Sequence, residues 1–266
     1  MEGKKTNTML EFIKKYSVVV KLLNSVGAYF LLLGRVFKKP EKLKIYKELF
    51  FREVNDMGTS SVGIVSFVGT FVGAVIAIQM RNQLSVNPLL PPSLIGYSTK
   101  EILILEFAPT MISIILAGKV GSFICSSIGT MRVTEQIDAL DVMGINSASF
   151  LILPKIAAAL IAFPILIMLS IVLGILGGAA IGLVTGYWAI VDYIDGIREG
   201  YSAFNLFYSI FKAVVFAFVI STIPAYYGYN VRGGSLEVGK ASTTAVVWTS
   251  VLILVLDLVI TQIMLG

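Results

Sequence analysis

The chain has 266 residues, of which 56% are hydrophobic and 14% are charged, and its formal net charge is +5. Soluble globular domains carry about 25% charged residues, so this composition excludes a soluble protein and predicts an all-α integral membrane protein. The absence of histidine removes Ser-His-Asp and Cys-His catalysis and the commonest zinc ligand. The single cysteine, Cys125, excludes an internal disulfide. We therefore expect neither catalytic residues nor a metal site.

Basic residues are concentrated near the N-terminus, where twelve of the 21 Lys and Arg residues lie before residue 53. A basic segment beside a membrane anchor marks the cytoplasmic side and anionic lipid, so we expect no nucleic acid partner. No small-residue cleavage site follows an early apolar core, so the first hydrophobic elements are expected to be retained.

Residues 1–52 are expected to form an N-terminal cytoplasmic or interfacial segment, and residues 53–266 a membrane domain. Within the first segment, residues 16–34 are apolar but contain Lys21 and Asn24, and basic clusters flank them on both sides. A span would place one of these clusters outside, against the positive-inside tendency, which favours an interfacial elbow helix. A transmembrane helix is the alternative, because the run is close to the ~18-residue threshold.

About five transmembrane helices are expected in the rest of the chain. They are residues 60–79, residues 102–128, the uncharged stretch between Lys155 and Asp192, residues 204–227 and residues 243–265. This topology puts sixteen Lys and Arg residues inside and three outside, which predicts a cytoplasmic N-terminus and an outward C-terminus. Gly69 and Gly73, and the ladder Gly174, Gly178, Gly182 and Gly186, are spaced four apart and predict helix-packing faces.

A short amphipathic helix is predicted between the second and third spans, at residues 134–143. Thr134 is the expected N-cap, Glu135 lies in the first turn, and Gly144 ends the helix. Val133, Ile137 and Leu140 form an apolar stripe opposite an acidic face. A helix this short cannot cross a bilayer, so it is expected at the cytoplasmic surface, either as a docking site for a partner or as an ordinary surface helix.

Four motifs resemble one family. GTMRVTEQIDALDVMGI from Gly129, preceded by EFAPTMISIILAGKVGS from Glu106, closely resembles the central signature of MlaE-type permeases. LPKIAAALIAFPIL from Leu153 and RGGSLEVGKASTTAVV from Arg232 also resemble that family, so the likeness covers nearly everything after about residue 60. These permeases are the membrane subunits of ABC systems that move phospholipids between bacterial membranes.

The resemblance implies a permease domain at residues 53–266 that works as a homodimer enclosing a lipid cavity in the bacterial inner membrane. It implies three partners besides phospholipid: an ABC ATPase, a periplasmic MCE-domain ring protein and, as a weaker expectation, a small cytoplasmic STAS-domain protein. No cofactor is expected on this chain, and ATP is expected on the ATPase.

The residue patterns and, for Glu106, the resemblance lead to expected roles for individual residues. Those expected along the lipid path are Gln79, Glu106 and Lys119. Those expected to couple the permease to the ATPase are Thr134, Glu135, Gln136, Asp138, Ala139, Leu140 and Asp141. Those expected to be structural are Pro109, Gly118, Gly129, Thr130, Met131, Gly144, Gly234, Gly239 and Asp257.

For two of these residues, an alternative role remains open. Glu106 could instead be a structural partner of Lys119 or Lys212, since ionisable groups in spans usually face a bundle interior or a cavity. Asp257 could be a proton relay instead of a structural hydrogen-bonding group.

The chain departs from the family pattern at three positions. An arginine is usual at the positions of Leu105 and Lys119, and a glutamate is frequent at the position of Ser127.

Gly234 to Ala241 nearly matches the nucleotide-binding loop G-x-x-x-x-G-K-[ST]. Position 241 is Ala instead of Ser or Thr, and spans flank the motif instead of a strand and a helix. The glycines are expected to make a tight inner turn. Two other functions remain open from sequence: an ATP-independent membrane scaffold that recruits cytoplasmic proteins, and an integral-membrane enzyme, which the lack of histidine and of clustered carboxylates disfavours.

Overall fold

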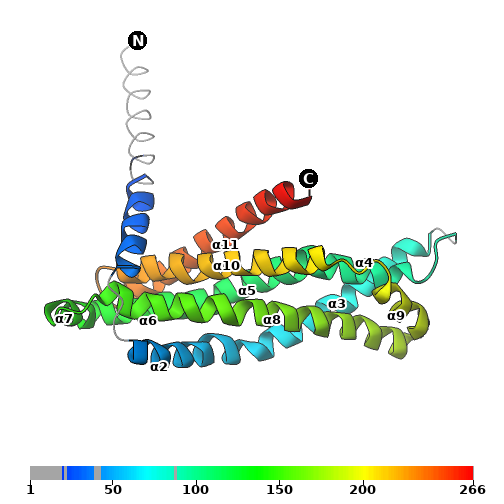
Figure 1. Ribbon diagram of the computed structural model, residues 1–266, viewed down its shortest axis with the longest axis horizontal. Helices are drawn as coiled ribbons and strands as arrows, with labels where there is room; N and C mark the ends of the chain where they lie inside the picture. The colour runs from blue at the N-terminus through cyan, green and yellow to red at the C-terminus, as the bar shows by residue number, and fades with distance from the viewer. Residues whose placement is uncertain (1–19, 21–22, 39–42, 87–88, 266) are drawn as a thin grey trace, which may run out of the picture.

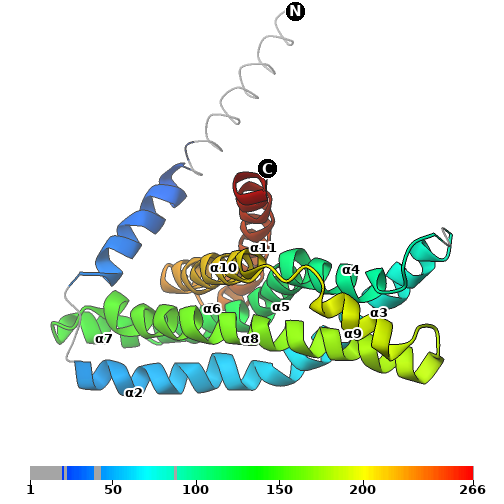
Figure 2. The ribbon, with the colours of Figure 1, turned by 45° about the vertical axis from the view of Figure 1, so that its right-hand side comes forward.

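The computed structural model describes residues 20, 23–38, 43–86 and 89–265, and the regular structure in these ranges is helical. Five helical runs are long and apolar enough to cross a membrane: Tyr46–Leu84, Leu94–Val133, Ser147–Thr185, Ala203–Tyr229 and Ser235–Leu265. The prediction of an all-α membrane protein with five spans is confirmed. Most of these runs lie side by side, whereas the last one leaves the bundle at an angle (Figures 1 and 2).

The first two spans are not regular α-helices throughout. The first consists of α2 (Leu43–Glu53), the π-helical η1 (Val54–Gly58), the 3-10 turn η2 (Thr59–Ser61) and α3 (Val62–Leu84). The second consists of α4 (Leu94–Ile102), the π-helical η3 (Leu103–Met111), α5 (Ile112–Leu116), the π-helical η4 (Ala117–Gly121) and α6 (Ser122–Val133). π-helical turns are rare and are frequent at functional sites, so η3 and η4 mark the second span for closer inspection.

The remaining helices follow the predicted order. They are α7 (Gln136–Val142), α8 (Ser147–Thr185), α9 (Ile190–Arg198), α10 (Ala203–Tyr229) and α11 (Ser235–Leu265). The helical run that contains the first predicted span, residues 60–79, begins at Tyr46 and includes the charged Glu53. Its carboxylate accepts a hydrogen bond from Lys155 on α8 at 2.6 Å, and both side chains are buried.

α3 and α8 pack with their backbones in contact. A Cβ at Gly73 would overlap the backbone of Gly174, and a Cβ at Gly177 would overlap the carbonyl of Thr70. Small residues allow this close approach between membrane helices. The predicted packing faces are confirmed for Gly69, Gly73 and Gly174, and for Gly178 and Gly182, which pack against the rings of Tyr193 and Trp188. Gly186 has a different role, since it ends α8 with φ +67°.

An apolar helix, Leu23–Val36, precedes the first span. The described helix lies against the bundle, where the Tyr29 hydroxyl is 2.7 Å from Thr222 Oγ1 of α10. The side chain of Asn146 donates to the carbonyls of Arg35 and Lys38 and fixes the end of this helix. Residues 16–19, 21 and 22 lie outside the described residues, and the interfacial elbow stays a prediction.

The contact between α3 and α8 gives a stability prediction. Gly73→Leu is expected to destabilise the protein by about 1–3 kcal/mol or more, because the side chain would be forced into the backbone of α8. Gly63→Leu is the matched control in the same helix, since a Cβ there meets nothing within 4 Å. Thermal unfolding of the two variants in detergent, followed by size-exclusion chromatography, measures the difference. Equal melting temperatures would contradict the packing described here.

Candidate functional site

Three ionisable side chains from three different segments meet inside the bundle. Lys212 on α10 places its Nζ atom 3.0 Å from both carboxylate oxygens of Glu106 in η3 and 2.7 Å from Oδ1 of Asp257 on α11. The ammonium also lies 3.3 Å from the carbonyl oxygen of Leu105. Glu106 and Asp257 therefore share one cation, and we call these three residues the polar cluster.

Hydroxyl groups complete the polar cluster. Thr110 donates to Asp257 Oδ1 at 3.0 Å, and Thr261 lies 3.2 Å from Glu106 Oε1. The hydroxyls of Tyr208 and Thr261 are 2.8 Å apart, and the Lys212 ammonium lies 4.6 Å from the centre of the Tyr208 ring. Each carboxylate is thus bound by the lysine and by at least one hydroxyl, as buried charges require.

The three side chains differ in exposure. Lys212 is fully buried, Asp257 is 16% exposed and Glu106 is 40% exposed. Glu106 is thus the member of the polar cluster that a molecule outside the bundle can reach. The structure answers one question left by the sequence, because the ionic partner of Glu106 is Lys212 and not Lys119. Asp257 makes the hydrogen bonds that were expected of a structural group.

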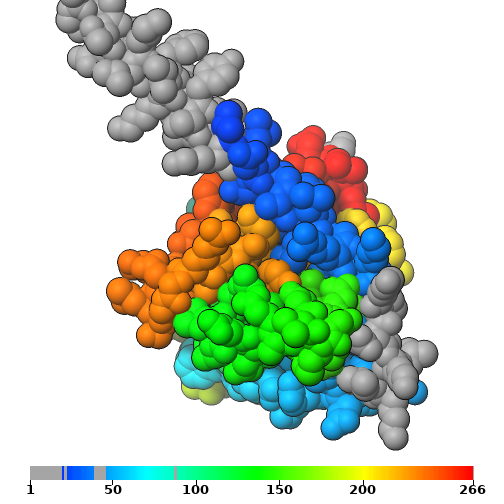
Figure 3. All heavy atoms as spheres, turned by 90° about the vertical axis from the view of Figure 1, so that its left-hand side faces the viewer, coloured from blue at the N-terminus to red at the C-terminus, as the bar shows by residue number. Residues whose placement is uncertain are grey.

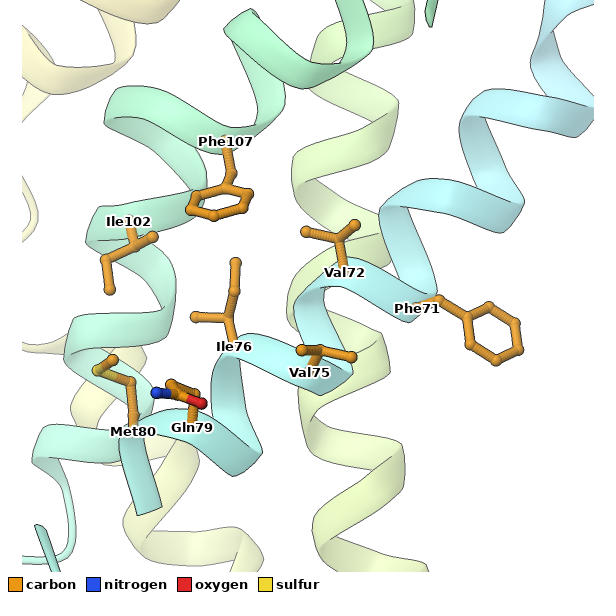
Figure 4. A pocket seen from close by; sticks show the side chains of 8 residues that line it. All are labelled: Phe71, Val72, Val75, Ile76, Gln79, Met80, Ile102 and Phe107. Carbon is orange, nitrogen blue, oxygen red and sulfur yellow. The ribbon is translucent and has the colours of Figure 1, made fainter. Parts of the chain in front are cut away.

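An apolar pocket lies between α3 and the start of the second span, and it shares the segment η3 with the polar cluster. Its volume is about 420 Å³, within the range of small-molecule sites. Figure 4 shows Ile76 of α3 and Phe107 of η3 pointing toward one another, with Gln79 and Met80 together at one end. The lining residues are Phe71, Val72, Val75, Ile76, Gln79, Met80, Ile102 and Phe107. Gln79 supplies the only side-chain amide among them.

The residues predicted for the lipid path are therefore not all in one place. Gln79 lines the pocket, whereas Glu106 precedes the lining residue Phe107 in the chain but does not line the pocket itself. Lys119 lies apart in η4, where its ammonium donates to the backbone carbonyl of Ser60 and lies 3.3 Å from the Ser60 hydroxyl. The apolar lining residues were missed by sequence reasoning because one apolar residue in a span resembles another.

α7 lies at one end of the molecule, and Figure 3 shows this end face on, with the segment around α7 at the front. Ile137 is fully buried and Val133 and Leu140 are partly buried, so the predicted apolar stripe is confirmed. The residues that remain exposed on α7 and beside it are Glu135, Gln136, Asp138, Ala139, Asp141, Val142 and Met143. The surface is thus acidic with a small apolar tip.

The predicted N-cap of this helix is wrong. The Thr134 hydroxyl donates back to the carbonyl of Thr130 at 2.9 Å, so Thr134 ends α6 and does not begin α7. The turn between the helices falls on Glu135, whose φ of 60° is left-handed and unusual for a residue other than glycine. Arg132 forms an ion pair of 2.6 Å with Asp138 across this turn. Gly144 ends the segment as predicted, with φ +77°.

The near match to a nucleotide-binding loop also has a different structure from the predicted turn. The turn is made by residues before Ser235, where Gly233 has φ +113°, and Gly239 lies inside α11. Glu237 and Lys240 pair with each other at 2.7 Å on the surface of that helix. A helical Gly239 and Lys240 cannot form a loop that cradles phosphates.

Comparisons with known proteins identify the family of this multi-span chain. The family model described as Permease MlaE matches residues 50–263. The chain belongs to the MlaE permease family. It is therefore an ABC transporter permease and a multi-pass membrane protein, as the motifs predicted.

Individual relatives support the same assignment. A protein of Rickettsia prowazekii named "Probable ABC transporter permease protein" is 32% identical over 91% of this chain and 93% of its own length. A protein of the same printed description from Synechocystis is 31% identical over 88% of each chain. The Haemophilus influenzae protein named "Intermembrane phospholipid transport system permease protein MlaE" is 28% identical over 93% of this chain and 95% of its own length.

The polar cluster of this MlaE-family permease gives a second stability prediction. Lys212→Met removes the one cation that Glu106 and Asp257 share and is expected to lower the free energy of unfolding by about 3 kcal/mol or more. Lys119→Met removes an ammonium that binds only Ser60 among the described residues, and it is expected to cost about 1 kcal/mol or less. Unfolding titrations in mixed micelles measure both values. A smaller loss for Lys212→Met than for Lys119→Met would refute the electrostatic role of the polar cluster.

Proposed function

We propose that this permease moves phospholipids between the inner and outer membranes of a bacterium as a homodimer, powered by a separate ATPase chain. The observation that carries the proposal is the likeness to the intermembrane phospholipid transport permease of H. influenzae over nearly the whole of both chains. The apolar pocket supports it, because an acyl chain requires an apolar surface and little else.

The lipid path is assigned to the pocket and the polar cluster. Acyl chains lie along Val75, Ile76 and Phe107, and the Gln79 amide and the exposed part of Glu106 receive polar headgroup atoms. Lys119 is assigned to the same path, nearer the cytoplasm, because its ammonium has no carboxylate partner among the described side chains.

The ATPase is assigned to α7. This helix exposes acidic groups and the apolar side chains of Val142 and Met143, which are 88% and 66% exposed. A surface of this kind suits docking into a groove of another protein. Lipid transport further requires that nucleotide on the ATPase and lipid on the permease each favour one of two states of the dimer. A periplasmic MCE-domain protein and a STAS-domain protein complete the assembly.

We assign the N-terminus to the cytoplasm and the C-terminus to the periplasm.

The helix α11 is assigned to the dimer interface. Its outward side carries a continuous row of exposed apolar residues, which include Val247, Trp248, Val251, Leu254, Val255, Leu258 and Ile263. In a bilayer such a row can face lipid or a second copy. Two copies that meet near α11 would place their polar clusters close to a shared cavity.

Docking of the ATPase can be tested by charge reversal. The double variant Glu135→Lys/Asp138→Lys is expected to lose a co-purifying ATPase, because it reverses the exposed acidic surface of α7. The control is Glu237→Lys, which reverses an exposed acidic residue on α11. Mild solubilisation from the native membrane and mass spectrometry identify the partners. Retention of the ATPase by the double variant would refute the docking site, and absence of any ATPase from the wild type would favour the scaffold.

Filling the pocket tests the lipid path. Val75→Trp is expected to reduce bound phospholipid at least about tenfold, since the indole occupies the space of an acyl chain that contributes ~0.8 kcal/mol per buried CH₂. Ile64→Trp is the control, because Ile64 is exposed on the same helix but does not line the pocket. Lipid extraction and quantitative mass spectrometry of the purified proteins give the measure. Equal lipid content in both variants would contradict the assignment.

A further inference from the structure

The C-terminal half of α11 is held to the bundle differently from its N-terminal half. Val238, Ala245, Thr249 and Ile253 form one buried stripe along the first part of the helix. Beyond Ile253, most of the helix surface is exposed and apolar, and Figures 1 and 2 show its end projecting from the bundle.

Apolar contacts alone hold such a helix weakly in a membrane. Lipid chains are as apolar as leucine, so there is no hydrophobic gain when the C-terminal half of α11 leaves lipid to pack on α10. Ile260, Leu256 and Met264 do pack against the core, but packing of this kind is available in many orientations. Specific polar contacts must therefore set the position of this half.

The polar contacts of this half of α11 all belong to two residues. Asp257 binds Lys212 and Thr110, and Thr261 binds Tyr208 and Glu106. Among the described Lys and Arg side chains, only Lys212 forms ion pairs with two residues. Those two residues lie on η3 and on α11, so a single ammonium joins the second and fifth spans through the fourth.

We propose that Lys212 is a positioning residue that latches the C-terminal half of α11 to the bundle and thereby sets the tilt of that half. Without the ammonium, the carboxylates of Glu106 and Asp257 repel each other, which moves α11 outward. Glu106 is the exposed end of this latch and Asp257 the covered end.

One consequence rests on the proposed lipid path. A lipid headgroup that passes Glu106 must do so beside the latch, so a headgroup that draws the Lys212 ammonium away from Asp257 would link lipid passage to the tilt of α11. The latch itself is independent of lipid, because the contacts that form it lie within the chain.

Distances between two spin labels test the proposal. Cys125 is replaced by Ala to give a cysteine-free background, and labels are attached through Phe204→Cys at the start of α10 and Ile263→Cys near the end of α11. Both positions are exposed and outside the polar cluster. Labelled protein is diluted with excess unlabelled protein in nanodiscs, so that pulsed dipolar spectra report pairs within one chain.

The wild type is expected to give one narrow distance distribution. Lys212→Met and Asp257→Leu are expected to shift it to longer distances or broaden it, and Lys212→Arg to restore it, since arginine keeps the charge. Glu106→Gln keeps the pair of Lys212 and Asp257 and is expected to leave the distance unchanged. Lys240→Met, which removes an exposed lysine from the start of α11, is the control.

Two results would overturn the latch. In the first, both Lys212→Met and Asp257→Leu keep the wild-type distribution. In the second, Glu106→Gln shifts the distance as far as Asp257→Leu does, which would assign the position of α11 to Thr261 and Glu106. If Lys212→Met does not fold, the distance distributions of Asp257→Leu and Lys212→Arg still test the latch. A shift in these spectra together with normal lipid content would leave the latch standing and count against the lipid path.

Discussion

The close contact of α3 with α8 determines where the other parts of this permease lie. No side chain separates the two backbones at Gly73 and Gly174, so the distance and rotation of α3 are fixed by van der Waals contact. The opposite side of α3 then presents Val75 and Gln79 to the second span and creates the apolar pocket. A wider helix pair would turn these residues elsewhere, even with every span still present.

The polar cluster also fixes the relative positions of helices, but through ion pairs instead of van der Waals contact. Apolar packing is permissive in a bilayer, whereas an ion pair at 2.7 to 3.0 Å permits few geometries. The departure from the family pattern at Leu105 removes an arginine next to Glu106. Lys212 nevertheless gives Glu106 a cation from another helix, so the ion-pair network does not depend on the missing arginine.

Much of the fold could be predicted from sequence because its signals are local. Length and hydropathy gave five spans, and glycine spacing indicated the faces of α3 and α8. The helix that carries the first span begins before the predicted residues, and the pairing of its Glu53 with Lys155, 102 residues away, has no signal in the local sequence. The geometry at Glu135 was missed for another reason: a left-handed residue that is not glycine has no signature in the sequence.

The candidate site also has features that could be predicted from the sequence and features that could not. Glu106, Lys212 and Asp257 could each be recognised as unusual in a span, but their meeting is a property of packing across more than 100 residues of chain. The buried apolar stripe of α7, and with it the exposed acidic side, was predictable from the spacing of Val133, Ile137 and Leu140. The pocket was not, since its lining consists of the residue types that fill every span.

Pro109 gives Lys212 a second significance. Proline has no N–H, so the carbonyl four residues earlier, which belongs to Leu105, cannot receive the bond that a regular α-helix would give it. The Lys212 ammonium lies 3.3 Å from that oxygen and supplies a donor from a neighbouring helix. The ammonium that binds both carboxylates thus also contacts the backbone of the irregular π-helical segment around Pro109, so a change at Lys212 would alter that backbone contact as well as the ion pairs.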